Sequence, residues 1–172
     1  MNSLDGPSFP ISDTIDNFVR RIGHIVMWVN LALVFIIILQ VVLRYGFNGG
    51  HPKIEELQWH FYALAVMFGL SYSQVEDSHV RVDVMAMHFS DKTTRIFEIL
   101  GILIFLLPFV FIMFYHSLDF VADSWRINEH SDAPVGLGWR WLIKAVIPLS
   151  FGMLGLSALS RLMRDVAALS RR

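Results

Sequence analysis

The chain has 172 residues, of which 55% are hydrophobic, and its mean hydropathy is +0.53. Its formal net charge is −1 and it has no long run of like charge, which excludes the usual basic surface of a nucleic-acid-binding protein. It contains no cysteine, which excludes disulfides, thiolate metal sites and cysteine nucleophiles.

Four apolar stretches dominate the sequence, and each approaches the roughly 17–25 residues that a helix needs to cross a bilayer. Helices of a soluble protein would instead alternate apolar and polar faces. The pattern predicts an all-α integral membrane protein, a four-helix bundle with amphipathic interfacial helices that forms a single membrane domain, 1–172. The expected spans are about 22–44, 56–75, 92–116 with an extension to about 126, and 140–160, built on Ile25–Leu43, Leu57–Val75, Ile99–Phe114 and Leu142–Leu159.

The N-terminal region predicts an amphipathic helix that lies on the membrane surface and runs into the first span. Ser12 is placed to cap this helix. No small-residue cleavage site follows the first apolar run, so we interpret Ile25–Leu43 as a retained span and not as a signal peptide. The apolar face of the surface helix is predicted to consist of Ile15, Phe18, Val19 and Ile22.

Two acidic residues open the second helix, and the segment after it has an ambiguous pattern. Glu55 and Glu56 follow a turn predicted at Asn48–Gly50, and a helix N-terminus favours negative charge. Residues His79–Phe89 alternate in the manner of a short strand, but their Met and Ala residues favour a helix. We therefore expect a second interfacial helix between the second and third spans.

The third helix is predicted to be longer than the membrane requires. A helix from Lys92 to Trp125 would rise about 50 Å, whereas the hydrocarbon core is about 30 Å thick. This helix should tilt strongly or project, and an outer loop at Asn128–Gly138 should join it to the fourth span. Small residues in the second and fourth helices permit close packing: Gly69, Ser71, Ser73, Gly152, Gly155, Ser157 and Ala158.

The distribution of Lys and Arg predicts that both termini face the cytoplasm, because cytoplasmic segments carry the excess of positive charge. The opposite connections hold only Arg44, Lys53, Arg126 and Arg140. Four tryptophans at that outer interface agree with this orientation: Trp59, Trp125, Trp139 and Trp141. The basic residues on the cytoplasmic side are Arg20, Arg21, Arg81, Lys92, Arg95, Arg161, Arg164, Arg171 and Arg172.

One lysine lies inside the fourth span, where a charge is costly and needs a reason. Lys144 can extend its amine to the membrane surface, as long amines do. Alternatively, it can form an ion pair with Glu56 or Asp119 that holds helices together. Both interpretations remain open at the level of the sequence.

Histidines raise two alternative functions. His60 and His116 should lie at similar depth, and two imidazoles can ligate a haem, as in a cytochrome-type anchor subunit. His116, Asp119 and Asp123 share a helix face at a metal-ligand spacing, although such a stripe is usually a solvated face. No nucleophile elbow, Gly-rich phosphate loop or pair of interrupted spans occurs. We therefore expect an accessory to a larger partner, with no cofactor, and not an enzyme.

The segment Leu43–Val84 resembles the small membrane subunit of TRAP (tripartite ATP-independent periplasmic) transporters. The matching elements are an Arg-Tyr at the end of the first span, a Glu-Glu-Leu at the start of the second, and a His-Val-Arg-Val-Asp motif after it. The entry of the fourth span, Trp139–Phe151, is similar to that of a subgroup assigned to organic solutes. These elements are Arg44-Tyr45, Glu55-Glu56-Leu57, Gly69 and His79-Val80-Arg81-Val82-Asp83.

The resemblance implies a sodium-coupled secondary transporter of three parts in the bacterial inner membrane. A periplasmic binding protein captures an organic acid or similar solute and delivers it to a large multi-span subunit, which holds the substrate and sodium sites. The small subunit braces that large subunit, and a part in docking the binding protein is an open alternative. Under this hypothesis Glu56 near Arg44 fixes the outer ends of the first two spans. The cytoplasmic turn is fixed by hydrogen bonds and lipid headgroups through His79, Arg81 and Asp83.

Overall fold

The protein is an all-α bundle in the part of the chain that this computed structural model describes, residues 10–47, 49–76, 91–133 and 136–170. No strand occurs in these ranges, which confirms the predicted fold class of a membrane helical bundle. The helices are α1 (Pro10–Gly46), α2 (Pro52–Val75), α4 (Asp91–Gly101), the π-helical turn η1 (Ile102–Leu106), α5 (Leu107–Arg126) and α6 (Arg140–Ser170).

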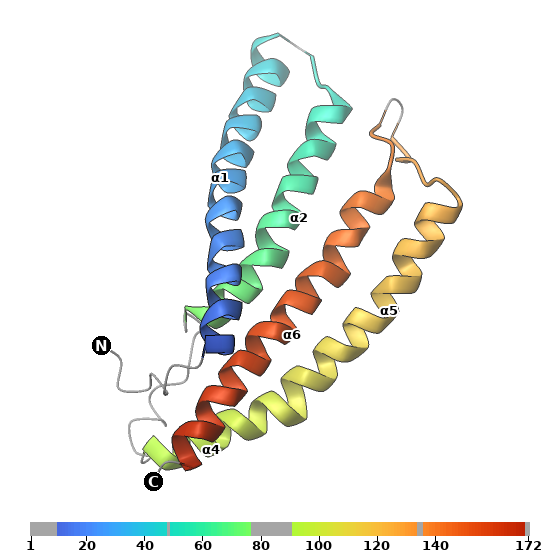
Figure 1. Ribbon diagram of the computed structural model, residues 1–172. Coiled ribbons are helices and arrows are strands. Elements are labelled where there is room, and N and C mark those ends of the chain that lie inside the picture. Colours follow the sequence, from blue (N-terminus) through green and yellow to red (C-terminus); the bar gives the residue numbers. More distant parts are fainter. Residues whose placement is uncertain (1–9, 48, 77–90, 134–135, 171–172) are drawn as a thin grey trace.

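The bundle has two distinct ends (Figure 1). We call the end where α1 begins and α6 finishes the terminal end, and the end with the connections from α1 to α2 and from α5 to α6 the loop end. Helix α6 is central, since it packs against α5, α2, α1 and α4, while α1 packs chiefly on α2. In Figure 1 the pairs α1–α2 and α5–α6 separate from each other toward the loop end.

Three of the described helical segments are long and apolar enough to cross a membrane by length and composition: Pro10–Gly46, Lys92–Arg126 and Arg140–Ser170. Helix α2 runs beside them but falls short of that measure, because Gln58, His60 and Gln74 interrupt its apolar run. A helix packed between α1 and α6 can carry such groups toward protein instead of lipid. The four predicted spans and their limits therefore remain a prediction.

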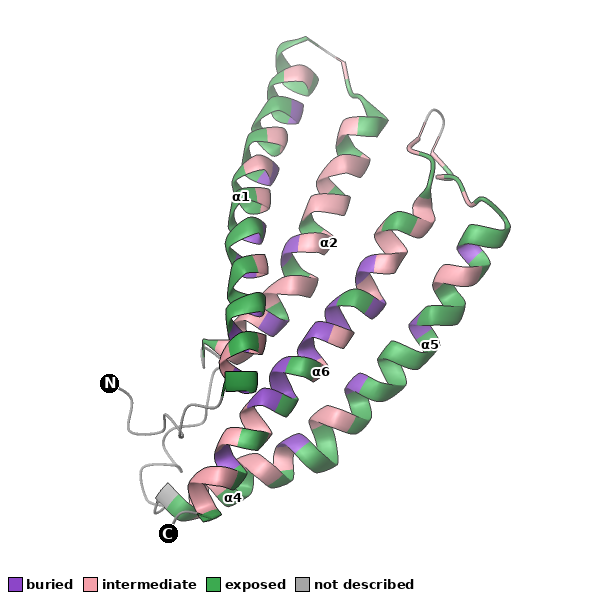
Figure 2. Cartoon of the chain, viewed as in Figure 1, coloured by how far each residue is buried: buried purple, intermediate pink, exposed green. Residues whose placement is uncertain are grey.

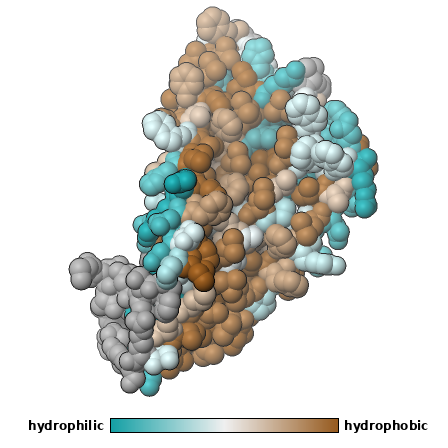
Figure 3. Space-filling model, viewed as in Figure 1, coloured by the Kyte–Doolittle hydropathy of each residue, from teal (hydrophilic) through white to brown (hydrophobic). Residues whose placement is uncertain are grey.

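Burial is concentrated on α6, as Figure 2 shows. Of its most apolar window 44% is buried within the chain, against 11% for the corresponding windows of α1 and of Lys92–Arg126. A small apolar core forms where α5 meets α6, around Val110, Phe151 and Leu154. Most of the apolar surface of α1 and α5 faces outward, and Figure 3 shows hydrophobic side chains over much of the visible face.

The segment from Asp91 to Arg126 is helical throughout, as predicted, but it contains a π-helical turn. Pro108 has no N–H to donate and its ring clashes with the preceding turn of an α-helix. The wider turn η1 lies directly before this proline, and the N–H of Leu107 accordingly bonds to the carbonyl of Ile102, five residues back.

The N-terminal prediction needs a correction. The surface helix and the first span form one continuous helix of 37 residues that begins at Pro10, a residue favoured in the first turn. Ser12 is therefore inside the helix and does not cap it. Its hydroxyl instead contacts α6, where its Oγ lies 2.6 Å from that of Ser160.

Candidate functional site

A cluster of polar side chains joins α1 to α6 at the terminal end. Arg164 Nε donates to Ser12 Oγ at 2.7 Å, and its Nη2 donates to Asp13 at 3.2 Å and to Asp16. Ser160 Oγ donates to the second oxygen of Asp16 at 2.7 Å. Both oxygens of this buried carboxylate are thus satisfied, which a buried charge requires. We call this set the α1–α6 cluster.

A second cluster joins α4 to α6 at the same end. Asp165 is only 1% exposed, and it accepts hydrogen bonds from Arg95 at 3.0 Å and from Arg161 at 3.3 Å. Arg161 also donates to Glu98 on α4 at 3.0 Å. Two cations and two anions therefore alternate across the contact. We call this set the α4–α6 cluster.

A further ion pair ties α1 to α2 near the terminal end, where Arg20 Nε lies 2.7 Å from Glu76. Nearby, Gly23 of α1 lies directly against the ring of Tyr72 on α2, so a Cβ at this position would meet the ring carbons. Each of α1, α2 and α4 is thus connected to the bundle at the terminal end by at least one charged side chain.

Small residues allow close approach in the middle of the bundle, as predicted for α6. A Cβ built on Gly155 would lie 3.2 Å from Val110, and one on Gly152 would lie 3.4 Å from Phe114, both on α5. Ser71 of α2 donates to the carbonyl of Ser150 at 3.3 Å. Gly69 is the exception, because nothing lies within 4 Å of a Cβ there.

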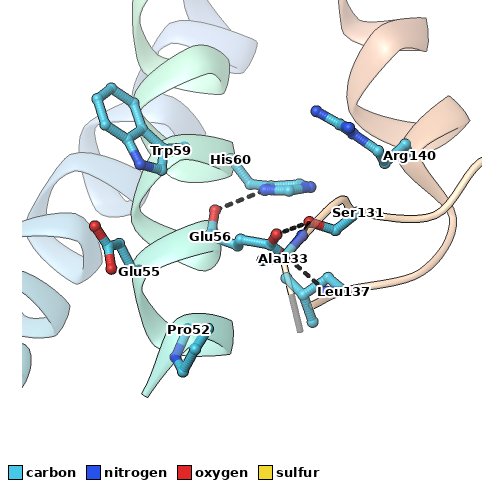
Figure 4. Close-up of a pocket in the computed structure, with 9 residues that line it drawn as sticks. All are labelled: Pro52, Glu55, Glu56, Trp59, His60, Ser131, Ala133, Leu137 and Arg140. Atoms are coloured by element: carbon cyan, nitrogen blue, oxygen red, sulfur yellow. Dashed lines mark hydrogen bonds between the residues drawn. The ribbon is translucent and has the colours of Figure 1, made fainter. Parts of the chain in front are cut away.

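At the loop end, Glu56 anchors the connection between α5 and α6. Its carboxylate accepts hydrogen bonds from the Ser131 hydroxyl and, at 2.5 Å, from the Leu137 N–H, while its carbonyl lies 2.7 Å from His60 Nδ1. These groups line a hollow of about 440 Å³, which Arg140 and Trp59 also border (Figure 4). The expected contact of Glu56 with Arg44 or Lys144 is therefore wrong, since its carboxylate faces the loop.

Lys144 is paired, but with a residue that the sequence argument did not name. Its ammonium contacts Glu129 in the outer connection and lies 3.9 Å above the centre of the Phe120 ring. The side chain is 16% exposed, so it neither reaches the surface freely nor contacts Asp119. The hydrogen bond from Lys144 lowers the pKa of the Glu129 carboxyl below its ordinary value.

The remaining predicted residues fall into two groups. Arg44 and Glu55 border a second hollow at the loop end, of about 470 Å³, together with the buried Gln40. The motif residues His79, Arg81 and Asp83 lie outside the described residues.

The two histidine hypotheses gain no support from the geometry. Within the described ranges, no three His, Asp or Glu side chains come close enough to hold a metal ion, so the metal-type spacing of His116, Asp119 and Asp123 does not form a site. Asp123 instead pairs with Arg126 at 3.3 Å. His60 is bonded to its own helix, and His116 packs edge-on against Tyr115 at 5.6 Å.

Sequence reasoning missed most of the polar contacts between helices. From the sequence, Ser12 is assigned only to a helix cap, and the arginines of the two clusters are assigned only to the basic cytoplasmic side. The acidic residues of the clusters and Ser160 receive no predicted role. A usable signal was present, because Ser157, Ser160, Arg161, Arg164 and Asp165 place several polar groups on a helix that is otherwise apolar. Polar residues in such a helix usually face a partner.

Comparison with known proteins identifies one family. A family model described as Tripartite ATP-independent periplasmic transporters, DctQ component, matches residues 33–168, which includes α2, α4, α5, most of α6 and the C-terminal part of α1. No curated protein matches the chain.

Proposed function

Because the chain belongs to the DctQ component family of tripartite ATP-independent periplasmic transporters, we propose that it is the accessory small membrane subunit of a sodium-coupled, binding-protein-dependent transporter for an organic acid or a similar small solute. Its place is the bacterial inner membrane, as a multi-pass protein with both termini in the cytoplasm. The family match is the observation that carries this proposal, and this is a family of transporter components, not of enzymes.

Bracing of the large multi-span subunit is the role we assign within that transporter. A brace must keep its own shape, and here α1, α2 and α4 are each held to the bundle by charged side chains. Breaking a buried pair such as Arg95–Asp165 costs about 3–5 kcal/mol, because the remaining charge is left without a partner. The Arg20–Glu76 pair on α2 is more exposed and contributes under about 1 kcal/mol. These contacts support a rigid scaffold whose polar groups hold helices together and do not handle cargo.

The surface of the bundle supports the same role. Large apolar side chains on α1 and α5 are exposed along their length, including Phe35, Phe109 and Phe111. In a membrane such faces contact lipid or another membrane protein. The proposed partners are the large multi-span permease subunit, the periplasmic solute-binding protein and membrane lipids.

Co-expression with a large multi-span subunit of the same transporter tests the proposal. We expect the two chains to copurify in a one-to-one ratio, and uptake by proteoliposomes only when both are present with the binding protein and a sodium gradient. Sodium replaced by potassium is the control for coupling. A preparation of this chain alone that takes up the solute would refute the accessory role.

Two variants separate an effect on assembly of the complex from an effect on solute selectivity. Glu56→Ala should free the loop that its carboxylate holds, and Arg81→Ala should remove a residue of the family-like motif; we expect both to lower the yield of complex. Lys53→Ala, an exposed cation on the same helix as Glu56, is the matched control. An altered preference among solutes with a normal yield of complex would contradict the bracing role.

A further inference from the structure

Two hollows follow one another along the contact between α1 and α2 toward the loop end, and we call the two together the groove. On α1 it is bordered by residues spaced as a single helical stripe, Leu33, Ile37, Gln40 and Arg44. The facing stripe on α2 consists of Tyr62, Trp59, Glu55 and Pro52. Because the two helices run in opposite directions, these stripes lie side by side over about three turns.

The groove changes character along its length. Its inner part, about 210 Å³, is bordered by Leu33, Ile37 and the aromatic rings of Trp59 and Tyr62. Its outer part, about 470 Å³, is bordered by Gln40, Arg44 and Glu55. One end is therefore apolar and the other polar, which is the division within an amphipathic lipid.

Gln40 is the observation that points to a ligand. Its side chain is buried, with the residue 9% exposed, and its Oε1 has no hydrogen-bond partner. A buried acceptor without a partner is costly, and its presence calls for a donor that occupies the site. Gln40 borders the outer hollow, so that donor belongs in the space next to Arg44 and Glu55.

The two charged side chains of the outer part, Arg44 and Glu55, form no ion pair with the described residues. The outer hollow is thus bordered by an arginine, a glutamate and a glutamine. A guanidinium binds phosphate, whereas a carboxylate and an amide oxygen together accept N–H donors.

We propose that this groove binds a glycerophospholipid whose headgroup carries both a phosphate and a primary ammonium, the chemistry of phosphatidylethanolamine. Arg44 holds the phosphate, and Glu55 and Gln40 Oε1 accept hydrogen bonds from the ammonium. One acyl chain lies in the inner part against Leu33 and Ile37. The site requires that the loop end lies at a membrane interface. Binding to the isolated chain does not depend on the proposed function, whereas retention of the lipid in the complex rests on it.

The aromatic residues of the groove agree with an interfacial position. Trp59 and Tyr62 are both largely exposed, and amphipathic rings concentrate at the level of the headgroups. The floor of the groove is closed where Gln58 Nε2 donates to the carbonyl of Ile36 at 3.5 Å, so a chain would lie on the surface of the pair and would not separate the helices.

Native mass spectrometry of the delipidated full chain in detergent tests the proposal. The probes are dioleoyl-phosphatidylethanolamine, dioleoyl-phosphatidylcholine and dioleoyl-phosphatidylglycerol, which share acyl chains and phosphate. The choline headgroup has no N–H, and the glycerol headgroup has no cation. We expect the ethanolamine lipid to bind about tenfold more tightly than either, which corresponds to about 1.4 kcal/mol.

Three variants assign the contacts. Gln40→Leu and Glu55→Gln should each reduce the preference for ethanolamine over choline, while Arg44→Gln should weaken all three lipids alike because all carry phosphate. Lys53→Gln removes a cation that lies at the same end but does not border the groove. It should change neither the preference for ethanolamine over choline nor the affinity for the three lipids. Circular dichroism checks that each variant is folded. If Arg44→Gln does not fold, the result for Gln40→Leu decides the test.

Two further measurements bear on the source of the headgroup. Soluble glycerophosphoethanolamine should compete at least a hundredfold more weakly than the lipid, because it lacks the chain that the inner groove holds. The complex with the large subunit should retain the ethanolamine lipid after purification. Equal binding of the three lipids, an unchanged ratio in Gln40→Leu, effective competition by the headgroup alone, or a lipid-free complex would each overturn the assignment.

Discussion

The α1–α6 cluster makes a quantitative prediction for Arg164→Gln. The guanidinium of Arg164 donates to Ser12 and to both Asp13 and Asp16, and the Asp16 side chain is only 7% exposed. Glutamine shortens the side chain and removes the charge, which leaves the buried carboxylate with Ser160 as its remaining donor. The free energy of unfolding should therefore fall.

The size of this loss follows from burial. Removing one partner of a buried pair costs about 3–5 kcal/mol. Because Arg164 is 25% exposed, water screens part of the interaction, and we expect a loss of about 2–3 kcal/mol. Arg126→Gln is the matched control, because Arg126 pairs with Asp123 at the surface, where the two side chains are 75% and 71% exposed, respectively. That pair should contribute under about 1 kcal/mol to the free energy of unfolding.

The double variant Asp16→Asn/Arg164→Gln removes the stranded charge as well. Its loss should be smaller than the sum of the two single losses by about 1–2 kcal/mol, since residues in one network couple. The free energy of unfolding is measured in mixed micelles with a rising fraction of sodium dodecyl sulfate, followed by circular dichroism. The four variants compared are Arg164→Gln, Asp16→Asn, the double variant and Arg126→Gln. Equal losses for Arg164→Gln and Arg126→Gln, or strict additivity in the double variant, would refute the reasoning.

Two further predictions concern α2 and the outer connection. Gly23→Ala should cost about 1–3 kcal/mol in the same assay, because the new methyl group meets the Tyr72 ring, whereas Gly69→Ala should gain up to about 1 kcal/mol from helix propensity alone. Because the pKa of Glu129 is lowered in the folded protein, its contribution to stability is complete above the ordinary value of 4.5 and is lost progressively as the pH falls from that value through the lowered pKa. The protection of the loop amides against hydrogen exchange, corrected for the pH dependence of the intrinsic rate, should therefore fall below that pH. Lys144→Met, which removes the hydrogen-bond donor, should weaken this dependence, because Arg140 remains near Glu129.

The sequence predicts the fold well because apolar run length is a strong signal. Four predominantly apolar runs, of which only the fourth contains a charged residue, lead to four long helices, and the excess length of Lys92–Trp125 leads to one extended helical segment. The partners of Glu56 and Lys144 could not be predicted. These partners lie in the connection between α5 and α6, and no periodic pattern fixes the path of a loop. Ser131 and Glu129 reach these residues only through that path.

The separation between polar ends and an apolar middle has a consequence for assembly. Lipid chains are as apolar as Leu, so burial of apolar surface does not by itself choose a neighbour or a register for a membrane helix. Polar contacts do choose, and in the described part of the chain they are concentrated where α1, α2 and α4 meet α6 or each other near the terminal end and where the outer connection meets α2 and α6. The outward apolar faces of α1 and α5 take no part in these contacts. A partner can therefore cover them without competing for the groups that hold this bundle together, which is the physical condition that a bracing subunit must meet.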